Sequence, residues 1–236
     1  MLTFLTLGLL IGIAHAFEAD HLTAVSALVS GKSAPREIVR HGAIWGLGHS
    51  LTLLIVGMVV IAIGHVIPDR LASGLELAVG LMLVGLGAHV LYRLNRDRVH
   101  FHKHAHSDGQ EHFHLHSHAA EIAPHNRDAH RHAHPDRSAW RSLLVGVMHG
   151  MAGSAALVLV GATALTSPLA GLGYIALFGF GSMIGMVAVS ALIAVPLSYS
   201  ARYLTRANTA LQLIIGLLTI GIGALTISHT AHLLIG

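Results

Sequence analysis

Four side chains able to bind a metal ion lie within seven residues near the start of the chain, at His15, Glu18, Asp20 and His21. The surrounding residues 2–30 form an apolar stretch long enough to cross a bilayer. An imidazole or carboxylate inside the hydrocarbon layer is unfavourable unless it is paired or bound to a metal. The cluster therefore predicts a functional site within the membrane, in preference to a purely structural role.

The spacing of these four residues sets their relative directions on a helix. At 100° per residue, His15, Glu18 and His21 share one face, whereas Asp20 points about 100° away from His21. A regular helix cannot direct all four side chains at one ion. Either the helix is locally unwound here, or Asp20 acts indirectly by orienting a ligating imidazole.

Two further histidines are expected at a similar depth. His49 follows the glycines of Gly46-Leu47-Gly48, which permit close helix packing. His149 precedes Gly150 in a later apolar stretch and is interpreted either as a ligand or as a hydrogen-bond partner between helices. The predicted metal site comprises His15, Asp20, His21, His49, Glu18 and His149. Since the chain contains no cysteine, nitrogen and oxygen ligands remain, and these suit divalent nickel, cobalt, zinc or copper.

The sequence resembles the nickel/cobalt transporter family. His15, the four residues after it and Asp20-His21 match that family's H-x4-D-H signature, and Gly48-His49-Ser50 resembles its second helical motif. The resemblance implies selective transport of Ni(II) or Co(II), with these histidines and Asp20 essential.

The chain also departs from this family. Eight spans are usual there, Glu18 replaces an aspartate, and a later acidic motif is replaced by a segment beginning at His149. These features look like the shorter, urease-accessory type of permease, with cytoplasmic nickel-enzyme maturation proteins as partners.

Composition identifies the elements that must position these residues. The 236 residues are 53% hydrophobic and 11% charged, with a mean hydropathy of +0.67, which excludes an ordinary soluble domain. The basic residues lie between apolar runs and do not form a patch typical of nucleic-acid binding. The fold class is therefore an all-α membrane protein with six transmembrane helices, expected at residues 2–30, 42–67, 71–92, 140–166, 169–199 and 207–235.

The six helices are predicted to form a 3+3 inverted repeat. Three segments of the first half recur in the second half at nearly constant offsets of 134, 133 and 136 residues: residues 9–16 at 143–150, 46–48 at 179–181, and 75–87 at 211–223. A unit with an odd number of spans begins its second copy on the opposite side of the membrane, and such repeats place substrate sites near the midplane. The predicted units are residues 1–92 and 140–236.

Residues 93–139 carry 12 of the 21 histidines and have no helical or strand period, so they are predicted to be a disordered, metal-binding loop. The first, third and fifth loops between the predicted helices hold 13 of the 14 Lys and Arg residues, which are therefore expected on one side of the membrane. The positive-inside rule then places the His-rich loop in the cytoplasm and both termini outside, in a bacterial inner membrane.

The leading hypothesis is a secondary transporter for Ni(II) or Co(II), with no cofactor besides the transported ion. Uptake is favoured, and efflux is the alternative because the His-rich loop is similar to that of nickel/cobalt exporters. No ATP-binding motif is present, so transport is expected to use an ion gradient or a separate partner. A metal-dependent membrane enzyme and a metal sensor based on the loop are alternatives of another class.

Overall fold

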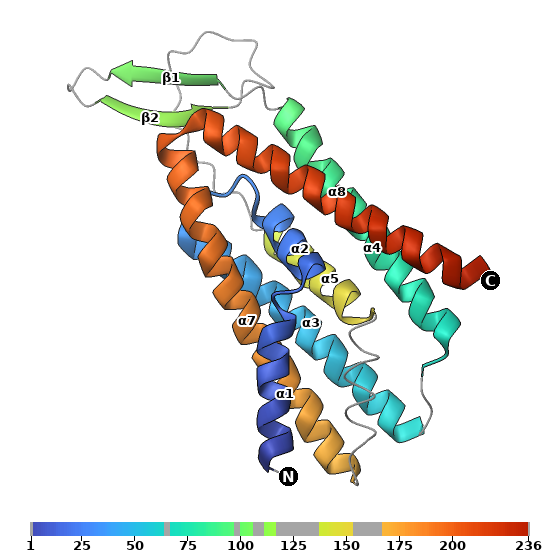
Figure 1. Cartoon of the computed structure of the whole chain (residues 1–236). Helices are drawn as coiled ribbons and strands as arrows, with labels where there is room; N and C mark the ends of the chain where they lie inside the picture. The colour runs from blue at the N-terminus through green and yellow to red at the C-terminus, as the bar shows by residue number, and fades with distance from the viewer. Residues whose placement is uncertain are drawn as a thin grey trace.

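The computed structural model describes residues 2–63, 67–96, 100–105, 111–116, 137–152 and 167–235. Within these ranges the chain is a bundle of helices with one short hairpin (Figure 1). The elements are α1 (Leu2–His15), α2 (Ala19–Val29), α3 (Pro35–Ile63), α4 (Asp69–Arg96), β1 (His100–Ala105), β2 (Glu111–His116), α5 (Arg137–Gly150), α7 (Pro168–Tyr203) and α8 (Thr205–Ile235).

The helices confirm the prediction of an all-α, multi-pass membrane protein. By length and composition, α3, α4, α7 and most of α8 can each cross a membrane, and the bent pair of α1 and α2 makes a fifth span if it is counted as one. The expected fourth span covers residues 140–166. Its first part is α5, and residues 153–166 lie outside the described ranges. The described residues thus support four or five spans, and the prediction of six is not tested further.

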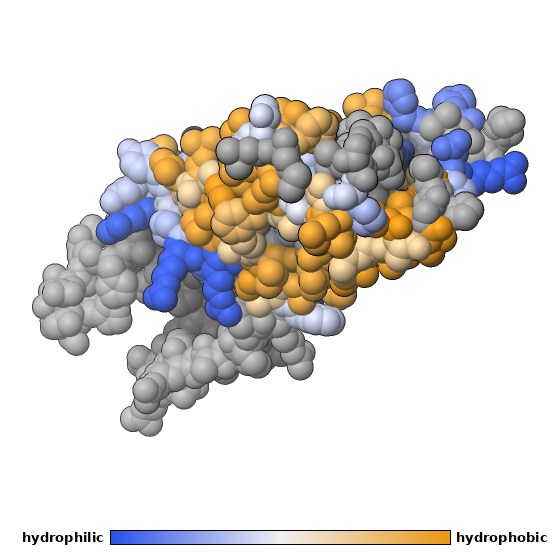
Figure 2. All heavy atoms as spheres, turned by 90° about the horizontal axis from the view of Figure 1, so that it is seen from below, coloured by the Kyte–Doolittle hydropathy of each residue, from blue (hydrophilic) through white to orange (hydrophobic). Residues whose placement is uncertain are grey.

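Apolar side chains cover much of the outer surface. Leu51, Ile63, Leu192, Val195 and Leu217 are each more than half exposed, although they belong to the long apolar helices. Figure 2 shows hydrophobic residues over most of the described surface in view, with hydrophilic residues in separate groups toward its edges. Exposure on this scale fits lipid as the surrounding solvent.

The first span is broken between α1 and α2, where the chain bends by 55°. Tight turns replace helical bonds here: the backbone N–H of Phe17 donates to Ala14, and that of Glu18 to His15. Glu18 is extended, with ψ at 151°, and α2 begins at the next residue. The local unwinding that the spacing of the site allowed is therefore observed.

Glycines allow the helices around this break to pack backbone to backbone. A Cβ at Gly12 would lie 2.1 Å from the carbonyl oxygen of Phe178, and one at Gly146 would lie 2.1 Å from that of Trp45. No side chain fits at such a distance. α1 consequently runs alongside α7 and α3 alongside α5, and each pair is parallel.

The pair of α4 and α8 is antiparallel and forms a separate contact. A Cβ at Gly80 would lie 3.0 Å from the carbonyl oxygen of Gly223, and one at Gly216 would lie 3.3 Å from that of Gly87. α2 lies between this pair and the other helices (Figure 1).

Part of residues 93–139 has regular structure, which differs from the expected irregular loop. α4 continues to Arg96, and β1 pairs with β2 so that His100, His102 and His104 lie opposite His116, His114 and His112. The physical reason is that histidine at every second position repeats with the period of a strand. Residues 97–99, 106–110 and 117–136 lie outside the described ranges.

Candidate metal centre

Four imidazoles from four helices meet at the break in the first span. His15 ends α1, and His21, His49 and His149 belong to α2, α3 and α5. The ring of His21 lies 4.3 Å from those of His15 and His149, between centroids, and 5.1 Å from that of His49. All four side chains are buried, with His21 and His49 fully so.

The break in the helix explains how two of these rings reach one point. In a continuous helix, His15 and His21 would be separated by a rise of about 9 Å. The 55° bend turns the start of α2 back toward the end of α1. The two imidazoles consequently meet edge to face.

Several ring nitrogens at this centre have no hydrogen-bond partner among the described residues. They are Nε2 of His15, Nε2 of His21, both nitrogens of His49 and Nδ1 of His149. Ligand atoms of His15, His21 and His49 lie within 4.8 Å of one another. Buried polar atoms without partners are unfavourable, so this set of imidazole donors fits a bound transition metal.

Two carboxylates orient the imidazoles. His15 Nδ1 lies 2.8 Å from Glu18 Oε1, and His21 Nδ1 lies 2.9 Å from Asp20 Oδ1. An Nδ1–H that donates to a carboxylate leaves Nε2 deprotonated and able to bind a metal. In both of these histidines, Nε2 is a ring nitrogen that lacks a hydrogen-bond partner among the described residues.

Asp20 of α2 also contacts α5. Its Oδ2 lies 2.9 Å from His149 Nε2, while Oδ1 also accepts the backbone N–H of His21. Ligand atoms of Asp20, His21 and His149 form a second group within 4.8 Å. Asp20 therefore connects two imidazoles, a geometry compatible with either direct ligation or orientation.

Two buried aromatic rings close the sides of the centre. Trp45 lies 5.4 Å from His21 and 5.7 Å from His149, and Phe178 lies 5.3 Å from His15, between ring centroids. These residues limit access of water and lower the local dielectric constant. Their residue types do not mark them as site residues in the sequence, although each directly precedes one of the aligned glycine motifs, Gly46 or Gly179.

Ser182 was also missed. It is fully buried on α7, and its Oγ has no hydrogen-bond partner among the described residues. The offset of 133 residues that relates Gly46 to Gly179 also relates His49 to Ser182. The repeat therefore indicates Ser182 as the counterpart of His49 in the second half of the sequence.

The structure thus brings together every residue of the predicted site. His15, His21, His49, His149 and Asp20 surround the centre, whereas Glu18 reaches it through His15 and keeps about half of its side chain exposed. The arrangement defines a class: a polytopic helical membrane protein with a buried imidazole and carboxylate centre at a broken span.

Comparison with known proteins agrees with this class and gives the family. Residues 3–225 match the family described as cytochrome C biogenesis protein transmembrane region, and the chain belongs to that family. It is 35% identical to the urease accessory protein UreH of Bacillus sp. (strain TB-90) over 221 residues, which cover 90% of this chain and 86% of the relative.

A more distant relative is longer than this chain. The chloroplast protein FOR GROWTH AND FERTILITY 1 of Arabidopsis thaliana is 26% identical over 217 residues, which cover 92% of this chain and 56% of that protein. No solved structure matches the chain. The matches support the urease-accessory side of the resemblance, and the nickel/cobalt signature remains an interpretation of the motif.

Proposed function

We propose that the protein is a secondary transporter that carries Ni(II) or Co(II) across the membrane through the central imidazoles. The observation that carries this proposal is the group of four buried histidines at a break in a membrane span, each with a ring nitrogen that has no hydrogen-bond partner among the described residues. Ligand atoms of three of them, His15, His21 and His49, lie within 4.8 Å of one another. Broken helices at the midplane are typical of substrate sites in transporters. The cation is the cargo, so it must be able to leave as well as bind.

The types of ligand atom at the centre limit which metal ions are candidates for the transported ion. Imidazoles supported by carboxylates, in a chain without cysteine, suit borderline divalent cations over calcium or magnesium. The H-x4-D-H spacing resembles that of nickel/cobalt transporters, and this resemblance supports those two metals as the cargo. A relative named as a urease accessory protein supports a role in supplying metal to enzyme maturation.

The helix contacts support a 3+3 inverted repeat. The offset of 134 relates Gly12 to Gly146, and the offset of 133 relates Trp45 to Phe178. The contact between Gly12 and Phe178 is therefore equivalent to the one between Gly146 and Trp45. An offset of 136 likewise exchanges the two glycine contacts of α4 and α8. Equivalent pairs across the two halves are what a two-fold axis through the centre would produce.

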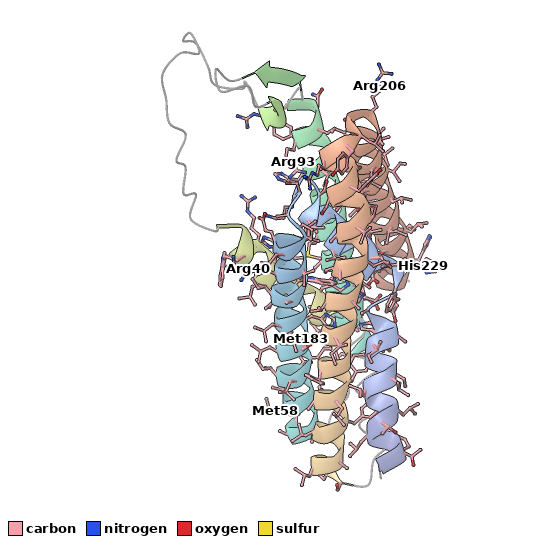
Figure 3. The ribbon with its side chains drawn as sticks, turned by 90° about the vertical axis from the view of Figure 1, so that its left-hand side faces the viewer. Arg40, Met58, Arg93, Met183, Arg206 and His229 are labelled. Atoms are coloured by element: carbon pink, nitrogen blue, oxygen red, sulfur yellow. The ribbon has the colours of Figure 1, made fainter. Side chains whose placement is uncertain are left out.

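The positions of the arginines along the molecule support an orientation with both termini outside a bacterial inner membrane. Figure 3 shows Arg93 and Arg206 toward one end of the molecule and Met58 toward the other. Under the positive-inside rule, the end with the arginines faces the cytoplasm. Uptake would then deliver the ion to the side of the His-rich segment and of nickel-enzyme maturation proteins.

The direct test is transport into vesicles containing the purified protein, with Ni, Co and Zn measured in parallel. His49→Ala should lower the rate or the apparent affinity for the cargo at least about tenfold, the scale expected for a lost ligand. His229→Ala is the matched control, because His229 is exposed on α8 (Figure 3) and belongs to neither group of ligand atoms among the described residues. Normal Ni and Co transport by His49→Ala would refute the proposed site.

A further inference from the structure

A cavity of about 690 Å³ lies apart from the four imidazoles. Its walls come from the end of α2, the turn that follows, the start of α3, the second half of α4 and residues 141–148 of α5. None of the residues assigned to the metal centre lines it.

Basic side chains line one part of this cavity. Lys32, Arg93 and Arg141 contribute to its walls, against the single carboxylate of Glu37 among the lining residues. Lys32 forms an ion pair with Glu37. The excess of basic over acidic side chains among the lining residues disfavours a bare divalent cation and favours an anion.

The backbone holds one of these guanidinium groups in place. Arg93 Nη2 donates to the carbonyl oxygen of Ser30 and lies 3.3 Å from Gln212 Oε1. Gly31 has a φ of +82°, and a Cβ added there would lie 2.3 Å from Arg93 Nη2. A glycine is therefore required for Arg93 to lie against this turn.

The other part of the cavity is apolar and open to the surroundings. Leu28, Leu86, Leu144, Val145 and Met148 line it, and the side chains of Leu144 and Met148 are 43% and 38% exposed. Trp140, one residue before Arg141, is 62% exposed. Tryptophan beside arginine at a helix end is typical of the membrane–water interface.

We propose that this cavity binds an anionic phospholipid. The phosphate would lie between Arg93 and Arg141, and an acyl chain would follow the exposed apolar wall formed by Leu144 and Met148. Charge complementarity selects an anionic head group, and basic pockets between helices at the interface are known to suit such lipids. The apolar wall selects a lipid over a free phosphate ion, because only a lipid covers both parts of the cavity.

The test uses the full-length protein, stripped of lipid in a neutral detergent. Phosphatidylglycerol and phosphatidylcholine are added in turn, and bound lipid is counted by native mass spectrometry alongside the melting temperature. We expect phosphatidylglycerol to bind more tightly and to raise the melting temperature more. Arg141→Gln should weaken its binding about fivefold, the effect of one basic residue near an anionic surface.

Arg206→Gln is the matched control, because Arg206 is an exposed arginine at the same end of the molecule but not in the cavity (Figure 3). It should leave phosphatidylglycerol binding unchanged. Gly31→Ala, which displaces Arg93, should weaken binding with the arginine still present. Each variant must elute as a single monodisperse peak, which separates lost binding from lost fold.

The apolar wall is tested by Leu144→Gln and by inorganic phosphate. The variant should weaken phosphatidylglycerol binding, and phosphate alone should not reproduce the rise in melting temperature. Equal binding of the two lipids, or equal losses in Arg141→Gln and Arg206→Gln, would overturn the proposal. Full stabilisation by inorganic phosphate would show an anion site without a lipid and would overturn it as well.

Discussion

At the scale of single residues, Asp20 has more contacts with the centre than any other carboxylate described. One oxygen holds His21 through both its ring and its backbone, and the other holds His149 on a different helix. The carboxylate of Glu18 pairs with His15, and its side chain is about half exposed. Two carboxylates two residues apart in one motif are therefore expected to differ in importance.

Replacing Asp20 by Asn should lower affinity for Ni(II) about 10- to 100-fold, the range for losing a group that orients metal ligands. The amide removes a negative charge and disturbs two imidazoles at once. Glu18→Gln should have a smaller effect, since it changes one half-exposed contact. Equilibrium dialysis of both purified variants compares them, and an equal or larger loss in Glu18→Gln would contradict this ranking.

At the scale of helices, close glycine contacts keep the imidazoles at one level. Gly146 lies against Trp45, and Gly150 lies against the carbonyl of His49, where a Cβ would approach within 2.6 Å. These two contacts fix α5 on α3 directly beside the centre. Movement of α5 away from α3 would separate His149 from His49.

Gly146→Ala should destabilise the protein by about 1–3 kcal/mol, because the added methyl group overpacks the contact of α3 with α5. Gly85→Ala is a matched control within a membrane helix, since nothing lies within 4 Å of its added Cβ. It should be neutral or stabilising by up to about 1 kcal/mol. Thermal melts in detergent compare the two, and similar behaviour would argue against the close contact.

How much the sequence could predict also differs between elements. Apolar runs bounded by charged residues located α3, α4, α7 and α8, because burial in lipid requires such runs. The break after His15 could not be fixed, since Phe17 and Glu18 do not break helices as proline does. The contact between Asp20 and His149 spans 129 residues and depends on how helices pack, which local spacing does not encode.

At the scale of the whole molecule, the helices form two groups. α4 packs mainly on α8, while α1, α3, α5 and α7 pack on one another. α2 connects the groups, and a hydrogen bond of 3.3 Å from Thr219 to the backbone of Thr23 ties it to α8. The metal centre lies where α2 meets the larger group, so both groups are positioned to influence it.

The orientation of the two ends can be measured with introduced cysteines, because the chain has none of its own. Arg206 is exposed near the start of α8, and Arg70 is exposed near the start of α4. Because α4 and α8 are antiparallel, Arg206→Cys and Arg70→Cys place the two thiols at opposite ends of this helix pair. In intact cells, a membrane-impermeant thiol reagent should label the cysteine at 70 and not the one at 206. The reverse pattern would place both termini in the cytoplasm.

The His-rich segment is expected to modulate transport without forming the path. Replacing residues 99–136 by a flexible Gly/Ser linker should leave the preference among Ni, Co and Zn unchanged, because the central donors remain. Capacity or apparent affinity should change instead, since histidines near the entrance or exit buffer the ion. Transport assays with the three metals in parallel provide the measurement, and an altered preference would place this segment in the selective site.

The ends of the helices have an electrostatic consequence for the cargo. α1 ends at His15 and α5 ends at Gly150, so the centre receives two carboxyl-terminal ends, each equivalent to about half a negative charge. The opposing amino-terminal end of α2 carries Asp20 in its first turn, which offsets its positive macrodipole. The helix ends and Asp20 together therefore create a potential that attracts cations, and neutral substitutions of the imidazoles would weaken coordination while this potential remains.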